Sequence, residues 1–156
     1  MRVLLAAAVG LFSTPLFAGD IMIDDAYARA SRPGAPTGAM FMTIMNHGAE
    51  DDTLVAAASP VAKLVELHTH IEEDGVMKMR PVEEGFEIPA GGMHMLQRGG
   101  DHVMLMGVTE TLENGDMLPL VLTFEKAGEV TLEVMVDNDR DQGKHGMGQM
   151  NHKHSN

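Results

Sequence analysis

Histidine and methionine side chains gather in the middle of the sequence, where their types and spacing favour the binding of a soft metal ion. The potential donors are His68, His70, Met77, Met79, Met93, His94, Met95, His102, Met104 and Met106. On a β-strand, side chains two residues apart point to the same face. His68 with His70, Met77 with Met79, and His102 with Met104 would therefore each present two donors on one surface.

The available donors are imidazoles and thioethers, because the chain has no Cys but 15 Met and 8 His. A site of neutral nitrogen and sulfur donors selects Cu(I) above other ions, whereas zinc prefers thiolate, imidazole or carboxylate. A thioether has no proton to lose, so such a site keeps part of its affinity in mild acid, where imidazoles become charged. The lack of Cys excludes disulfides, iron–sulfur clusters and blue-copper centres.

Four of these residues form the predicted core Cu(I) site: His68, Met79, His102 and Met104. His70 is a further candidate ligand. Methionine adapts well to protein interiors, so the remaining methionines are expected to fill the core: Met22, Met40, Met42, Met45, Met77, Met93, Met95, Met106, Met117 and Met135. His47 and His94 are expected to be structural or exposed, as single strand or turn histidines usually are.

The composition changes after Val136, and residues 137–156 contain no aliphatic side chain other than two thioethers. Such a segment cannot bury itself, so we predict a flexible tail. His-rich tails commonly bind metal. The tail supplies a second set of candidate ligands for Cu(II) or Cu(I), namely His145, Met147, Met150, His152 and His154.

The donors are carried by short β-type segments separated by turn signals. Candidate strand segments lie at 21–28, 38–45, 52–58, 63–71, 76–82, 86–88, 93–97, 102–108, 117–125 and 129–136. Asp74-Gly75 is a strong hairpin signal. About eight or nine strands without helical crossovers indicate an all-β, antiparallel Greek-key β-sandwich. One such domain covers residues 19–136.

Residues 1–18 resemble a cleavable signal peptide, with Arg2 before the apolar run from Val3 to Phe12 and a cut after Ala18. We therefore expect an exported protein, periplasmic in a Gram-negative host, without stable membrane insertion. The chain has 11 Lys and Arg against 23 Asp and Glu, a net charge of −12. This acidity argues against nucleic acid and anionic membranes as partners.

The pattern of donors resembles the PCu(A)C family of periplasmic copper chaperones. Ten residues separate His68 from Met79, and twenty-two separate Met79 from His102, which begins His-Val-Met. The segments GVMKMRPVE, EIPAGG, RGGDHVMLMG and LTFEKAGEV are also similar, and the resemblance covers Ile21 to Val136. The second spacer is one residue longer than in the family, an insertion expected in a turn near 83–85. His70 stands where many relatives have Met.

The resemblance implies a cupredoxin-like or immunoglobulin-like sandwich that binds Cu(I) at His68, Met79, His102 and Met104. It also implies delivery of copper to the copper-binding subunits of cytochrome c oxidase, together with a Sco-type copper protein. The alternative is a pure binding module, either a copper buffer or scavenger without an oxidase partner or an immunoglobulin-like adhesion domain with incidental Met. A copper oxygenase with an N-terminal His brace is disfavoured because cleavage exposes Gly19, and no Ser/His/Asp or Gly-rich phosphate motif stands out.

Overall fold

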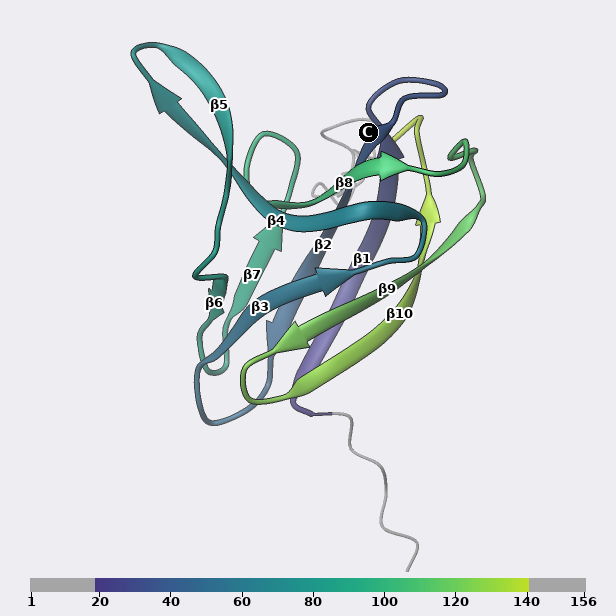
Figure 1. Cartoon of the computed structure of the whole chain (residues 1–156). Coiled ribbons are helices and arrows are strands. Elements are labelled where there is room, and N and C mark those ends of the chain that lie inside the picture. The colour runs from purple at the N-terminus through teal and green to yellow at the C-terminus, as the bar shows by residue number, and fades with distance from the viewer. Residues whose placement is uncertain (1–18, 141–156) are drawn as a thin grey trace, which may run out of the picture.

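The computed structural model describes residues 19–140, and this part of the chain is built from strands and turns without a helix. Figure 1 shows the strands wrapped into a sandwich. The strands are β1 (Ile21–Ala30), β2 (Thr37–Asn46), β3 (Asp52–Ala58), β4 (Ala62–Glu73), β5 (Val76–Pro81), β6 (Phe86–Ile88), β7 (Met93–Leu96), β8 (His102–Val108), β9 (Met117–Phe124) and β10 (Gly128–Val136). The predicted all-β sandwich and the positions of its strands are confirmed, with ten strands in place of the expected eight or nine.

The strands form one continuous sheet in the order β5-β4-β8-β2-β1-β10-β9-β3-β6, while β7 also pairs with β2. β1 and β10 run parallel, and the other pairs are antiparallel. The sheet folds on itself so that alternate residues of each strand face a common core. β9 illustrates the pattern, because Leu118, Leu120, Leu122 and Phe124 are buried between less buried neighbours.

A β-bulge in β1 changes which residues face outward. The pairing of β1 with β2 shifts between Asp24 and Tyr27, and Asp25 has a φ of 52°. A bulge inserts one extra residue and reverses the alternation of side chains beyond it. Met22 before the bulge and Tyr27 after it therefore both lie on the outer face.

The β4–β5 hairpin projects from the body of the sandwich (Figure 1). Its turn residues Asp74 and Gly75 have φ values of 53° and 76°. Two successive positive φ angles match the type I′ turn that suits the twist of paired strands. The hairpin signal in the sequence is thus confirmed, and β5 forms an exposed edge of the sheet.

The prediction for the methionines is correct for two residues and wrong for six. Met40 and Met42 are buried, as expected. Six others are 48–57% exposed, namely Met22, Met77, Met93, Met95, Met117 and Met135. All six are on strands whose outer side chains face solvent, and residue type alone does not reveal which face a strand position takes. Met45 and Met106 are half-buried.

The start of the predicted tail also differs from expectation. Residues 137–140 are bonded to the body: the Asp137 amide donates to the Ala28 carbonyl, and the Asn138 side chain donates to the Leu112 carbonyl. Arg140 pairs with Asp25. The predicted signal peptide and the rest of the predicted tail, from 141 onward, lie outside the described residues. Among residues 19–140, no helix is long and apolar enough to cross a membrane.

Candidate metal centre

Register brings the candidate donors together on the outer face of three neighbouring strands. His68 on β4 lies opposite His102 on β8, and His70 on β4 lies opposite Met79 on β5. Met104 on β8 is opposite Glu66, two residues before His68. Directly opposed side chains of antiparallel strands lie on the same face. The sheet therefore joins donors that are more than thirty residues apart in the sequence.

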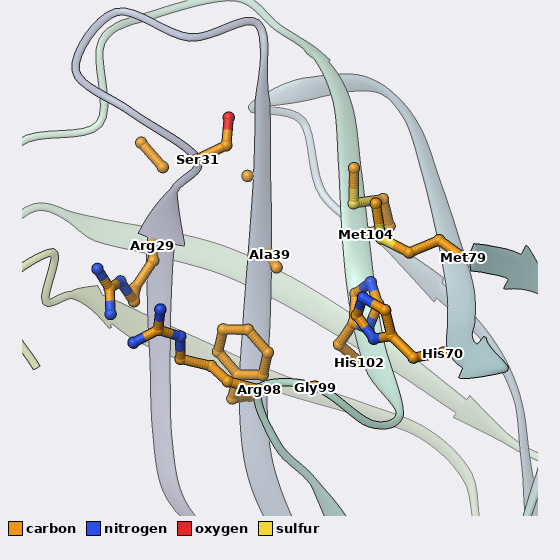
Figure 2. Close-up of a pocket in the computed structure, with 12 residues that line it drawn as sticks. Arg29, Ser31, Ala39, His70, Met79, Arg98, Gly99, His102 and Met104 are labelled. Atoms are coloured by element: carbon orange, nitrogen blue, oxygen red, sulfur yellow. The ribbon is translucent and has the colours of Figure 1, made fainter. Parts of the chain in front are cut away.

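Four of the donors line one open hollow of about 240 Å³. They are His70, Met79, His102 and Met104. Figure 2 shows these four side chains on one side of the hollow and the guanidinium groups of Arg29 and Arg98 on the other. The ring centroids of His70 and His102 are 5.2 Å apart. Two imidazoles and two thioethers thus face a common space.

The backbone carbonyl of Gly100 fixes the tautomers of both pocket histidines. The Nδ1 atoms of His70 and His102 lie 3.1 Å and 2.9 Å from this oxygen. A carbonyl only accepts hydrogen bonds, so both rings must carry a proton on Nδ1 and donate it. Each Nε2 is then left with its lone pair, which is the form of imidazole that binds metal.

His68, one of the four predicted ligands, does not line the hollow but lies beside it. Its Nε2 is 2.9 Å from a carboxylate oxygen of Glu66, and its ring centroid is 5.9 Å from that of His102. Nε2 donates to the ionised carboxylate, so the lone pair is on Nδ1. That Nδ1 is buried and makes no hydrogen bond. His68 therefore keeps one unused nitrogen donor next to the hollow.

The loop before β8 positions the Gly100 carbonyl and is held by Asp101. One carboxylate oxygen of Asp101 accepts a 2.6 Å hydrogen bond from the Thr69 hydroxyl, and the other lies 2.8 Å from Nε2 of His94. His94 also stacks on Phe86, at 5.0 Å between centroids. His94 is therefore structural, as predicted. The pattern of donors does not reveal this role of Asp101, although its place next to His102 is a signal.

Burial keeps His102 neutral. The side chain is only 2% exposed. Desolvation lowers its pKa below the ordinary value, and the hydrogen bond to Gly100 only partly opposes this effect. The neighbouring rings of His70 and His68 lower the pKa further. His102 consequently remains unprotonated, and able to bind metal, at a lower pH than an exposed histidine.

The donor chemistry of this hollow requires sulfur. Within residues 19–140, no group of three or more His, Asp or Glu side chains could hold a metal ion. The hollow reaches four donors only through the thioethers of Met79 and Met104, which suits a soft ion. Glu83 and Glu84, where the extra spacer residue is expected, lie in a turn between β5 and β6 and do not line the hollow. The tail candidates His145, Met147, Met150, His152 and His154 lie outside the described residues.

Comparison with known proteins places residues 21–136 in the family described as "Putative lipoprotein LpqE-like". The "Putative lipoprotein Lxx21020" of Leifsonia xyli subsp. xyli (strain CTCB07) is 31% identical over 119 residues, covering 76% of this chain and 70% of that protein. The solved "Copper-bound PCuAC domain from PmoF2" is 25% identical, with a TM-score of 0.64 over 77% of this chain and 94% of that one.

A second solved structure carries Cu(I) according to its description. It is the solution structure of CuI-DR1885 from Deinococcus radiodurans, 31% identical, with a TM-score of 0.59. The match covers 75% of this chain and 79% of that one. The sandwich fold predicted from the sequence is therefore the fold of PCuAC domains.

Proposed function

Because the chain belongs to the LpqE-like family, whose solved structural relatives are PCuAC domains, we propose that it is an exported copper chaperone. The family resemblance recognised in the sequence is confirmed. The observation that carries the proposal is the hollow in which two imidazoles with free Nε2 atoms face two thioethers. This donor set suits Cu(I), the ion that the relative from Deinococcus radiodurans carries.

Met79, His102 and Met104 are three of the proposed ligands, and β4 supplies the fourth. The family resemblance assigns the fourth position to His68, whereas the geometry of the hollow favours His70. His70 has its lone pair on Nε2 and lines the hollow, while His68 offers only a buried Nδ1. The variants H68Q and H70Q decide between them, and the hollow predicts the larger loss of Cu(I) affinity for H70Q.

The exposure of the site supports transfer of copper and not permanent storage. Met79 is 50% exposed at the edge strand β5. A donor from a partner protein can therefore approach the ion and displace one thioether while the imidazoles still hold it. The arginines across the hollow present positive charge to an incoming acidic surface. No catalytic step is proposed for the chain.

The proposed recipients are the copper-binding subunits of cytochrome c oxidase, with a Sco-type copper protein as a second partner. The proposed location is the periplasm, after cleavage of residues 1–18. The lipoprotein description of the curated relative supports export. A Cu(II)-binding role of the tail, through His145, Met147, Met150, His152 and His154, is part of this proposal.

The test is an anaerobic competition titration followed by a transfer assay. Residues 19–156 are loaded with one Cu(I) against a chromophoric chelator and mixed with the apo copper domain of an oxidase subunit II. The proposal expects one tight Cu(I) equivalent at the hollow, and recovery of that copper in the oxidase domain when the two proteins are separated. The variant M79L/M104L should bind Cu(I) more weakly, while M117L, which replaces an exposed methionine that does not line the hollow, should behave like the parent chain. Tight binding without transfer would favour a copper buffer.

A further inference from the structure

A second group of methionines lies on the outer face of the sheet, away from the hollow. Met22 on β1 is directly opposite Met45 on β2, and Met45 is directly opposite Met93 on β7. These three residues form a row across three adjacent strands, called here the methionine row. Met95, two residues after Met93 on the same face of β7, lies beside it.

The methionine row faces solvent and not the core. The neighbours of its members in the sequence point inward: Ile21 and Ile23 pack against the core, and Ile44 is fully buried. Side chains alternate along a strand, so the residues between them point outward. Met22 and Met93 are 50% and 57% exposed, and Met45, between them, is half-buried.

Packing does not explain why these outer positions carry sulfur. The solvent face of an antiparallel sheet normally carries polar side chains. Within residues 19–140, the exposed large apolar side chains are Met22, Val55, Leu64, Val76, Met77, Met79, Met93, Met95, Met117 and Met135, of which seven are Met. A merely apolar surface would use Leu, Ile and Val as readily. The selective use of Met points to a role for the thioether itself.

The spacing of the three strands lets the three thioethers reach one ion. Adjacent strands lie about 4.7–4.9 Å apart, and directly opposed Cβ atoms about 4.5–5.5 Å apart. Met22 and Met93 stand on either side of Met45, and each methionine side chain has three rotatable bonds with which to turn its sulfur toward the centre. From this geometry we propose that the methionine row is a second binding site for one Cu(I) ion.

The chemistry around the row favours a soft monovalent cation. The chain has no Cys, so no thiolate competes for such an ion. Three neutral thioethers leave the charge of the ion uncompensated at the site, which suits Cu(I) better than a divalent ion. Asp24, in the next row of the outer face opposite Thr43, adds a nearby negative charge.

The row and the hollow are separate sites. β2 runs between them, and Phe41 is the hollow-lining residue of β2 that is nearest in sequence to Met45 in the row. Four residues of extended strand span about 13 Å, which is too far for one ion to be shared. The chain should therefore bind Cu(I) in two independent steps outside the tail, and this holds whether or not the copper in the hollow is delivered to a partner.

The test follows each methionine separately during metal binding. Residues 19–156, labelled with ¹³C at the methionine ε-methyl groups, are titrated anaerobically with Cu(I), and with Ag(I) as a redox-stable probe. The row predicts that the methyl signals of Met22, Met45 and Met93 shift together, in a step distinct from that of Met79 and Met104. If these three signals stay unchanged while the other sites fill, the proposal is wrong.

Matched variants measure the stoichiometry. M22L/M45L/M93L should bind one Cu(I) fewer than the parent chain and should keep the Cu(I)-binding step that fills the hollow. The control M117L/M135L changes another opposed pair of exposed methionines and should bind as many Cu(I) ions as the parent chain. Equal Cu(I) binding by the triple variant and the parent would overturn the proposal. M79L/M104L should lose only the Cu(I)-binding step that fills the hollow. A failure of the proposed function is therefore distinguishable from a failure of the proposed second site at the methionine row.

Discussion

Replacing Asp52 should destabilise the fold without changing the metal site. Asp52 is 6% exposed at the start of β3, and its carboxylate accepts three backbone hydrogen bonds. The Thr53 and Lys126 amides donate to Oδ1 at 2.8 and 2.9 Å, and the Ala127 amide donates to Oδ2 at 2.9 Å. These bonds tie β3 to the β9–β10 turn, at the end of the sandwich away from the hollow.

The expected size of the effect follows from these three bonds. A hydrogen bond to a charged group contributes about 1.5–3 kcal/mol when both partners are buried. Lys126 is exposed, so in D52A water can replace the Asp52 carboxylate as a hydrogen-bond acceptor for the turn amides and offset part of the lost free energy. We therefore expect the loss to equal about two of the three hydrogen bonds, each at the low end of this range. The free energy of unfolding should fall by about 3 kcal/mol. For a domain of this size, this corresponds to a fall in Tm of roughly 10 °C.

The pH dependence of the same variant gives a second check. Burial raises the pKa of Asp52, but the three backbone donors outweigh burial and hold the pKa below its ordinary value. The folded-state pKa is thus lower than the unfolded-state pKa, so the carboxylate stabilises the fold above about pH 4 and loses this effect as the pH falls through the folded-state pKa. The gap in stability between parent and D52A should therefore narrow in acid.

The assay is thermal and urea unfolding of parent, D52A and the control D51A. Asp51 is exposed and accepts one hydrogen bond, from the Ala90 amide at 2.8 Å. D51A should lower the free energy of unfolding by no more than about 1 kcal/mol. Cu(I) affinity should be unchanged in both variants. If D52A is no less stable than D51A, the structural role assigned to this carboxylate is refuted.

Three further predictions concern the hollow, the loop that supports it and the turn before β6. Because burial lowers the pKa of His102, Cu(I) affinity measured by chelator competition should change little between pH 7 and 6, and a tenfold loss over that range would contradict a buried neutral ring. D101N, which disturbs the loop holding the Gly100 carbonyl, should weaken Cu(I) binding about tenfold in the same assay, whereas unchanged affinity would remove Asp101 from the support of the site. G85A should lower the free energy of unfolding by about 1–3 kcal/mol in urea unfolding. Gly85 has a φ of 80°, and an added Cβ would lie 2.2 Å from the Leu54 carbonyl oxygen. Wild-type stability of G85A would refute this clash.

The strands were predictable because alternation and turn residues are local signals. Asp74-Gly75 predicts its hairpin from two residues, and the β9 segment alternates between core and surface along its whole length. The bulge at Asp25 was not predictable in this way. It depends on how β1 pairs with β2, and it decides that Met22 faces outward instead of entering the core.

Three of the residues that line the hollow were also predictable, from the types of the donors and from their spacing. Met79, His102 and Met104 were predicted as ligands, and they line the hollow. The relative positions of His68 and His70 were not predictable, because both occupy the same face of β4. They differ because His68 is hydrogen-bonded to Glu66, whereas His70 is hydrogen-bonded to the Gly100 carbonyl. Neither contact is visible in the spacing of the donors.

The most direct test of the central claim is X-ray absorption at the copper edge on residues 19–140 loaded anaerobically with one Cu(I). Ending the chain at Arg140 keeps the residues that bond to the body and removes the His- and Met-containing tail. The hollow predicts a first shell of about two nitrogen and two sulfur scatterers. M79L/M104L combined with M22L/M45L/M93L, which removes the methionine row, should lose the sulfur contribution. A shell of nitrogen alone, or sulfur scattering that survives when M79L/M104L and M22L/M45L/M93L are combined, would contradict the claim that this hollow is the copper site.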